Sequence, residues 1–245
     1  MSELAGQVAL VTGGARNIGR AIARALAAGG ASVAVNARSQ SDDLAQTVQL
    51  IEGAGGHAMA VVADVTDASS VKRMVDAAVE RFGRLDILVN NAAVRIEQPF
   101  DAITLDDWHR IVSIVLDGAF LCSQAALPHL RRAGRGSIVN IGGETGHTGA
   151  TRRAHVVTAK AGLAGFTKAL ALDLAPDAIT VNCVVPGHIA TVRAAGQPGH
   201  RRELPPVGRQ GTPEEVAAMV RMLCGPDARY ITGQSMHVNG GNFLA

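Results

Sequence analysis

The sequence predicts an α/β fold with a doubly wound, seven-stranded parallel sheet and helices on both faces. The main observation is an alternation along the chain, in which short runs rich in β-branched residues are separated by longer segments of helical period. This alternation requires crossover helices and parallel strands. The length of 245 residues suits one domain over residues 1–245, and 47% hydrophobic residues with 28 glycines are typical of a compact, turn-rich protein.

Seven strands and six helices are expected in alternation. The expected strands are Val8–Val11, Ser32–Asn36, Ala58–Val62, Ile87–Val89, Ser137–Ile141, Thr180–Val184 and Ser235–Val238. The expected helices lie at about 17–29, 41–54, 68–82, 104–132, 154–175 and 213–224. In such a sheet, ligands gather at the carboxyl ends of the strands, so the residues that follow each strand are the candidates for chemistry.

The segment 188–211 has no clear period and contains Pro198, Pro205 and Pro206. A connection of this length is usually functional or mobile, so we expect a lid over the substrate site. A solvated loop without such a role is the alternative.

Composition excludes several classes of protein. The formal net charge of +2 gives no general attraction to nucleic acid or to an anionic membrane. The N-terminus has no basic region followed by an apolar one, and no apolar run of about 20 residues is apparent, so we expect a soluble, cytoplasmic protein. Cys122, Cys183 and Cys224 are odd in number and lie in apolar segments, which favours reduced core thiols and gives no metal-binding pattern.

A glycine-rich stretch, Thr12–Arg20, follows the first expected strand and opens the first expected helix. Glycines at such a turn let the backbone approach a pyrophosphate, whose charge the amides and dipole of the helix N-terminus favour. The context predicts a dinucleotide site.

This stretch resembles the fingerprint Thr-Gly-x-x-x-Gly-x-Gly of the short-chain dehydrogenase/reductase family, with Asn17 in place of the middle glycine; Asn tolerates left-handed backbone angles well. Further landmarks of the family recur in order: Asp64-Val65, Asn90-Asn91-Ala92-Ala93, Pro186-Gly187 with Ile189 and Thr191, Tyr230–Gly233 and Val238–Gly241. The resemblance covers nearly the whole chain and implies a Rossmann fold.

The resemblance also implies a set of cofactor contacts. Asp64 and Val65 hold the adenine, Asn90 and Ala92 line the cleft, and Ile189 and Thr191 contact the carboxamide. The full expected set is Gly13, Arg16, Asn17, Ile18, Gly19, Arg38, Asp64, Val65, Asn90, Ala92, Lys160, Pro186, Gly187, Ile189 and Thr191.

The residues near the second strand bear on the choice of cofactor. A carboxylate at this strand end would accept from the ribose hydroxyls of NAD, whereas arginine pairs with the 2′-phosphate of NADP. The strand ends Asn36-Ala37-Arg38-Ser39, without an acid, and Arg16 lies in the glycine-rich loop. NADP(H) is therefore favoured over NAD(H), unless both arginines only face solvent.

The expected catalytic residues are largely replaced. In the family that the chain resembles, a Tyr exchanges a proton with the substrate oxygen, and a Lys, a Ser and an Asn assist it. Lys160 fits the Lys, but Val156 stands at the Tyr position, Gly143 at the Ser position and Val115 at the Asn position. His147, Glu144 and His155 are the nearby side chains that could substitute as proton donors, although His155 is expected on the wrong helix face.

Three functions remain open from the sequence: an NADP-dependent oxidoreductase with an unusual proton donor (a side chain, water or the substrate), a non-redox enzyme on the same fold, and a catalytically inactive pseudoenzyme that regulates or scaffolds a partner. We favour the oxidoreductase because cleft, lid and fingerprint are retained. Arginines expected around the cleft mouth would suit an anionic substrate, if they do not merely face solvent: Arg95, Arg152, Arg153, Arg193, Arg201 and Arg202.

The resemblance also implies a homo-oligomer, a tetramer or a dimer, that pairs through the helices expected at 104–132 and 154–175. Small residues on both would allow close packing: Ala119, Cys122, Ala125 and Ala126 on the first, and Ala161, Leu163, Ala164 and Ala169 on the second.

Overall fold

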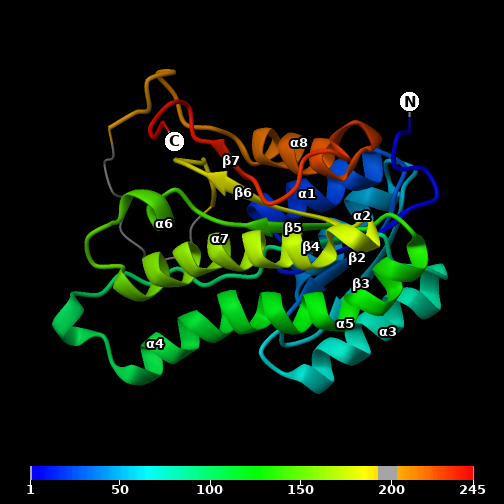
Figure 1. Cartoon of the computed structure of the whole chain (residues 1–245), viewed down its shortest axis with the longest axis horizontal. Coiled ribbons are helices and arrows are strands. Elements are labelled where there is room, and N and C mark those ends of the chain that lie inside the picture. The colour runs from blue at the N-terminus through cyan, green and yellow to red at the C-terminus, as the bar shows by residue number, and fades with distance from the viewer. Residues whose placement is uncertain (1, 193–202, 245) are drawn as a thin grey trace.

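The seven expected strands form one parallel sheet in the order β3-β2-β1-β4-β5-β6-β7, seen in a computed structural model that describes residues 2–192 and 203–244 (Figure 1). The strands are β1 Val8–Val11, β2 Ser32–Ala37, β3 His57–Val62, β4 Ile87–Asn90, β5 Ser137–Ile141, β6 Thr180–Pro186 and β7 Ser235–Val238. Each expected strand is present, which confirms the α/β, doubly wound Rossmann fold. The sequence order reverses at β1, with β2 on one side of it and β4 on the other.

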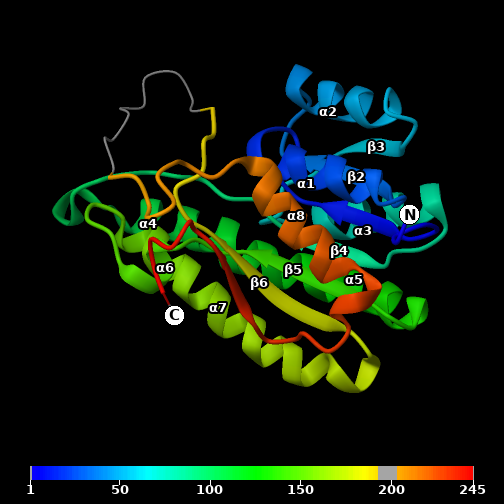
Figure 2. The same cartoon turned by 90° about the horizontal axis from the view of Figure 1, so that it is seen from above.

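Helices cover both faces of the sheet (Figures 1 and 2). They are α1 Asn17–Ala28, α2 Asp42–Glu52, α3 Ala68–Phe82, α4 Leu105–Val112, α5 Gly118–Ala133, α6 Thr145–Thr148, α7 Ala154–Leu174 and α8 Pro213–Cys224. Short 3-10 helices span Phe100–Ala102, Ala175–Asp177 and Pro226–Ala228. The α1, α2 and α8 helices lie on one face, and α3, α5 and α7 lie on the other, with α4 beside α7.

The central strands are buried on both faces because helices cover each side of a parallel sheet. Every residue of β1, β4, β5 and β6 is buried. Side chains alternate between the faces: Ala9 and Val11 join the apolar cluster under α1 and α8, whereas Val8 and Leu10 join the cluster under α3 and α5.

The helix expected over 104–132 is not continuous. A π-helical turn, Ser113–Asp117, separates α4 from α5. A single π-turn of five residues is too short to be recognised from the period of the apolar residues, and π-bulges are frequent at functional sites. Just after this turn, Gly118 lies against the loop that follows β3: a Cβ there would be 2.9 Å from Cγ2 of Val65.

Of two expectations about apolar segments, one is confirmed and the other is wrong. The thiols of Cys122, Cys183 and Cys224 are free and buried, as predicted. The expectation that no apolar run is long enough to span a membrane is wrong by length and composition, because Leu105–Ala133 passes that test in the described part of the chain. Its most apolar window has a mean hydropathy of 1.6 and is 39% buried, and a core helix of a soluble protein passes equally, so this is weak evidence for a membrane span.

Half of the eight small residues expected at a helix-to-helix contact between subunits lie inside the chain. Ala119, Cys122 and Ala126 on α5 and Leu163 on α7 are buried within the chain, so the role given to these four is wrong. Ala161 and Ala169 on α7 are exposed, and the role given to them stays a prediction. The helix phase set by the sheet turns them inward. The large apolar side chains that these helices do expose are Phe120 and Leu172, which are 48% and 79% exposed.

Candidate functional site

The glycine-rich loop between β1 and α1 is built from backbone conformations that few residues adopt. Gly13 has a φ of +61°, and Asn17 has a φ of +50°. Asn is among the residues that tolerate this left-handed region, so the replacement of a family glycine is accommodated. A Cβ at Gly19 would lie 2.2 Å from the carbonyl oxygen of Gly13, so only glycine lets the helix start this close to the loop.

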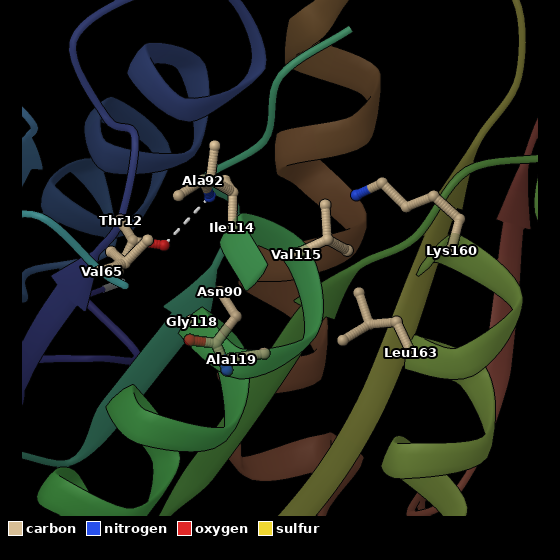
Figure 3. A pocket seen from close by; sticks show the side chains of 10 residues that line it. All are labelled: Thr12, Val65, Asn90, Ala92, Ile114, Val115, Gly118, Ala119, Lys160 and Leu163. Atoms are coloured by element: carbon tan, nitrogen blue, oxygen red, sulfur yellow. Dashed lines mark hydrogen bonds between the residues drawn. The ribbon is translucent and has the colours of Figure 1, made fainter. Parts of the chain in front are cut away.

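Polar side chains hold this loop in place from below. The Thr12 hydroxyl accepts from the backbone N–H of Asn91 at 2.9 Å and of Ala92 at 3.1 Å, the second of which is drawn in Figure 3. The Asn91 amide donates to the carbonyl oxygens of Thr12 and Gly13 at 2.9 and 3.0 Å. The Arg20 guanidinium donates to the carbonyl oxygen of Ala15 at 2.8 and 3.0 Å. The loop is therefore rigid before any ligand binds.

The N-terminus of α1 is left open for an anion. Arg16, at the N-cap, makes no side-chain capping bond, and the first turn contains no acidic residue. Amide groups at the start of a helix lack partners within it, and with the helix dipole they favour a phosphate. By contrast, the N-cap side chains of α2, α3, α4 and α8 accept a hydrogen bond from an amide of the first turn; these residues are Ser41, Asp67, Thr104 and Thr212.

A cleft of about 720 Å³ runs over this loop and the carboxyl ends of the strands. Ten of the expected cofactor residues line it: Gly13, Arg16, Asn17, Ile18, Gly19, Arg38, Asp64, Val65, Ala92 and Thr191. Arg95 and Arg110 line it as well. Arg110 was not expected from the sequence, because α4 approaches the cleft only through the tertiary fold. The volume, the open helix terminus and the cationic lining fit a dinucleotide with several phosphates.

The remaining expected cofactor residues lie outside the lining of this cleft. Asn90 lies beneath it, where its amide donates to Asn140 Oδ1 at 2.9 Å and to Ser123 Oγ at 3.2 Å. Pro186 ends β6, and Gly187 packs so closely on Asn239 that a Cβ would be 2.6 Å from that residue. Ile189 and Lys160 do not line the cleft either.

Lys160 faces a small cavity of about 10 Å³ between α7, the π-turn and β4 (Figure 3). Ten residues line this cavity: Thr12, Val65, Asn90, Ala92, Ile114, Val115, Gly118, Ala119, Lys160 and Leu163. The Lys160 ammonium donates to the carbonyl oxygen of Ile141 at 2.5 Å. Burial lowers the pKa of Lys160 to about 8, because the apolar surroundings disfavour its charge.

Val115 and Val156 belong to one apolar cluster. Val115 is 3% exposed on the π-turn, and Val156 packs from the first turn of α7 against the same group, together with Val94 and Ile96 of the loop after β4. Gly143 lies beside Lys160, and a Cβ added there would be 3.7 Å from Lys160 Cγ, an ordinary contact distance. A side chain would therefore fit at Gly143.

The candidate proton donors of the loop after β5 make their hydrogen bonds and ring contacts with residues other than Lys160. Glu144 is buried, and its Oε1 accepts from the Asn242 amide at 2.5 Å. His147, on the short α6, is exposed and packs its ring 4.7 Å from that of His237. Burial, and then the nearby His147, lower the pKa of His237. The sequence did not point to this histidine pair, because His237 comes from β7.

His155 is fully buried in the first turn of α7, and neither ring nitrogen has a hydrogen-bond partner in the described residues.

The arginines expected at the cleft mouth are only partly confirmed there. Arg95 and Arg153 both pair with Glu97, which offsets part of the positive charge. Arg152 is exposed with a φ of +60°. Arg193, Arg201 and Arg202 lie outside the described residues, as does the middle of the segment 188–211.

The parallel sheet, the glycine-rich loop and the cleft at the carboxyl ends of the strands define a dinucleotide-binding protein of the Rossmann class. A family model described as enoyl-(acyl carrier protein) reductase matches residues 13–242. The chain belongs to the short-chain dehydrogenase/reductase family, as its NAD(P)-binding oxidoreductase relatives also indicate.

Several relatives match over their whole length. The chain is 40% identical to a 3-oxoacyl-(acyl-carrier-protein) reductase of Synechocystis, over 98% of each chain. It is 38% identical to a reductase of the same name from Vibrio cholerae, over 99% of each. Among solved structures, a short-chain dehydrogenase from Burkholderia cenocepacia in complex with NADP has a TM-score of 0.92 at 38% identity, covering 98% of this chain and 99% of that one.

Proposed function

We propose that this protein is a divergent, NADP-dependent oxidoreductase that acts on a carbonyl or hydroxyl substrate with a non-standard proton donor. The observation that carries the proposal is the cleft itself, because its preformed loop and open helix terminus would serve no purpose in a protein without a dinucleotide. The bound cofactor would supply hydride to a carbonyl carbon.

The preference for NADP rests on the cations at the adenosine end of the cleft. Arg16 and Arg38 are both exposed and both line it, which leaves their guanidinium groups free to meet a 2′-phosphate. No carboxylate from β2 competes for this position, since β2 ends in Asn36 and Ala37. The NADP complex of the Burkholderia cenocepacia relative supports the same choice.

The proposed divergence from the family's catalytic residues rests on the apolar pair Val115 and Val156. Their packing in one cluster supports a coordinated loss of the polar Asn and Tyr positions, and Gly143 adds the loss of the Ser. The substrate class is a carbonyl compound, as the names of the 3-oxoacyl-(acyl-carrier-protein) reductases suggest. Arg152 and the arginines of the segment 193–202 would favour an anionic substrate.

We further propose that residues 1–245 form one cytoplasmic domain whose segment 188–211 closes over the substrate. Three buried, free thiols suit a reducing compartment. The isolated bridge between Ile189 and Gly211 supports a lid with fixed ends, because it joins the two ends of this segment.

The experiment compares the native protein with the triple variant Val115→Asn, Gly143→Ser and Val156→Tyr. We expect both to bind NADPH, and the native protein to reduce simple ketones slowly. The triple variant should be faster by about 10²–10⁴-fold, the usual contribution of acid–base assistance. NADPH binding without turnover of any carbonyl or hydroxyl substrate, by either protein, would favour the pseudoenzyme or a non-redox reaction instead.

A further inference from the structure

The C-terminal segment 239–244 follows β7 and lies beside the short α6 in both views (Figures 1 and 2). The Asn242 amide of this segment donates to the Glu144 carboxylate at 2.5 Å. The carbonyl oxygen of Gly240 accepts from the backbone N–H of Val207 at 3.2 Å. The segment therefore joins the loop after β5 to the chain that leads into α8.

Short-range hydrogen bonds give this segment its turn. The Asn239 amide donates to the carbonyl oxygen of Phe243 at 2.7 Å, and its Oδ1 accepts from the N–H of Gly241 at 3.0 Å. Gly240 and Gly241 have φ angles of +65° and +83°, which glycine adopts readily. The turn brings the ring of Phe243 back over β7.

Three rings pack together under this turn: His147 of α6, His237 of β7 and Phe243. The centroids of the two histidine rings are 4.7 Å apart, and Phe243 lies 6.0 Å from His147 and 5.2 Å from His237. Met236 and Val238 pack into the apolar cluster under α1 and α8, so His237, between them on the strand, projects to the opposite face. The rings therefore fasten the C-terminal turn to α6 and β7.

The other charged groups near this trio of rings have partners of their own. Glu144, in the loop after β5, is bound to Asn242. Lys160, from α7, which packs on α6, donates to the carbonyl oxygen of Ile141 at 2.5 Å. His188, from the loop after β6, contacts the side chain of Gln210.

We propose that His147 and His237 form a pH-sensitive latch, which fastens the segment 239–244 at neutral pH and releases it in mildly acidic solution. When both rings carry a proton, two like charges face each other across the 4.7 Å between their centroids, where partial burial limits screening by water. The rings then separate, and Phe243 loses its contacts.

The direction with pH follows from the cost of charging His237. Its Nδ1 is buried without a hydrogen-bond partner in residues 2–192 and 203–244. Burial, and then His147, lower its pKa, and Glu144 offsets only part of this. A histidine whose pKa is lowered in the fastened state stabilises that state above its ordinary pKa of 6.5, and this contribution is lost as pH falls below that value.

Release of the latch would act on the site through Glu144. This residue follows Gly143, which lies beside Lys160, and its backbone N–H donates to the carbonyl oxygen of Pro186 at 3.1 Å. Once Asn242 leaves, the carboxylate of Glu144 loses the hydrogen bond that holds it. We expect the loop after β5 to become more mobile as a result.

Hydrogen–deuterium exchange of the native protein at about pH 7.5 and about pH 5.5, corrected for intrinsic rates, tests the latch. We expect the amides of Val207 and Gly241 to exchange roughly tenfold faster at the lower pH, as one pKa unit would give, while β5 stays protected. The double variant His147→Phe and His237→Phe keeps three rings that cannot gain a proton, so it should lose this dependence. His57→Gln, which removes an exposed histidine at the start of β3, should behave as native.

A second measurement covers a double variant that fails to fold. Histidine ring shifts of the native protein are followed against pH by NMR, with His237→Gln and His57→Gln to assign the signals, and His237 should titrate at a lower pH than His57. Equal titration of the two, or equal exchange of Val207 and Gly241 at both pH values, would overturn the proposal. A pH dependence that persists in the folded double variant would do the same. Neither measurement requires turnover, so the latch and the proposed oxidoreductase stand or fall separately.

Discussion

At the scale of residues, the arginines of the cleft make the choice of cofactor testable. Replacing Arg38 or Arg16 by Gln removes a cation from the cleft wall without adding a charge. Hydrogen bonds to charged groups contribute about 1.5–3 kcal/mol, so each change should weaken NADPH binding by roughly 10- to 100-fold and leave NADH nearly unchanged. Titration of cofactor fluorescence measures both affinities.

A control for these variants is Arg24→Gln, an exposed position on α1 that does not line the cleft. It should change neither affinity. Equal losses for NADPH and NADH in Arg38→Gln would instead mean that Arg38 contacts a part shared by both cofactors, and the preference for NADP would need another cause.

Much of the site could be predicted from individual residues, because a short stretch of chain determines which residues it can contain. The residues of the glycine-rich loop are determined by backbone conformations that only certain side chains permit, so Gly13 and Gly19 carry a readable pattern. Arg110 and His237 could not be foreseen, because distant elements bring them to the cleft and to His147. Asn90 was expected in the cleft wall, yet it ties β4 to β5 beneath it.

At the scale of elements, the strands were predictable because buried parallel strands are short, continuous apolar runs. The break between α4 and α5 was not, since a single π-turn of five residues is too short to show a period of its own. The short α6 was also missed, because four residues are too few to show a helical period.

The contact between the N-terminal segment and α8 predicts a dependence of stability on pH. Arg221 donates to the Glu3 carboxylate at 2.5 and 2.9 Å, and this hydrogen bond lowers the pKa of Glu3 to about 2. A carboxyl whose pKa is lowered on folding stabilises the fold above its unfolded pKa, near 4.5, and this contribution is lost as pH falls toward 2.

Glu3→Gln should therefore lower the Tm by about 1–3 °C at pH 7, as expected of a partly exposed ion pair. The difference from native should shrink steadily between pH 5 and pH 2. Glu52→Gln, which removes the same charge from an exposed site at the end of α2, serves as the control in thermal melts followed by circular dichroism. A difference that stays constant with pH would show that Glu3 acts through packing alone.

At the scale of the whole molecule, the exposed apolar side chains on α5 and α7 support a homo-oligomer. Phe120 and Leu172 stand on the two long helices, and their burial against a second copy would favour association. We expect a dimer or a tetramer in sedimentation velocity at micromolar concentration. Leu172→Arg should shift it toward smaller species, whereas Leu50→Arg on α2 should not. A native protein that sediments as a monomer would contradict this expectation.

One feature of the cleft mouth bears on the rate of exchange. The Asn17 side chain makes two hydrogen bonds of 3.0 Å with the backbone of Val192: its amide donates to the carbonyl oxygen, and its Oδ1 accepts from the N–H. They join the glycine-rich loop to the segment after β6, where a family glycine could form no such link.

Asn17 and Val192 both line the cleft, so opening this link would widen the path by which a bound dinucleotide leaves. We therefore expect Asn17→Gly to raise the dissociation rate of NADPH by about 3- to 10-fold, with a smaller change in the association rate, in stopped-flow displacement experiments. An unchanged dissociation rate would mean that the cofactor escapes by another route. If the link does hold, Asn17 lengthens the stay of the spent cofactor, and its release becomes the ceiling on turnover once the chemical step is no longer the slower one.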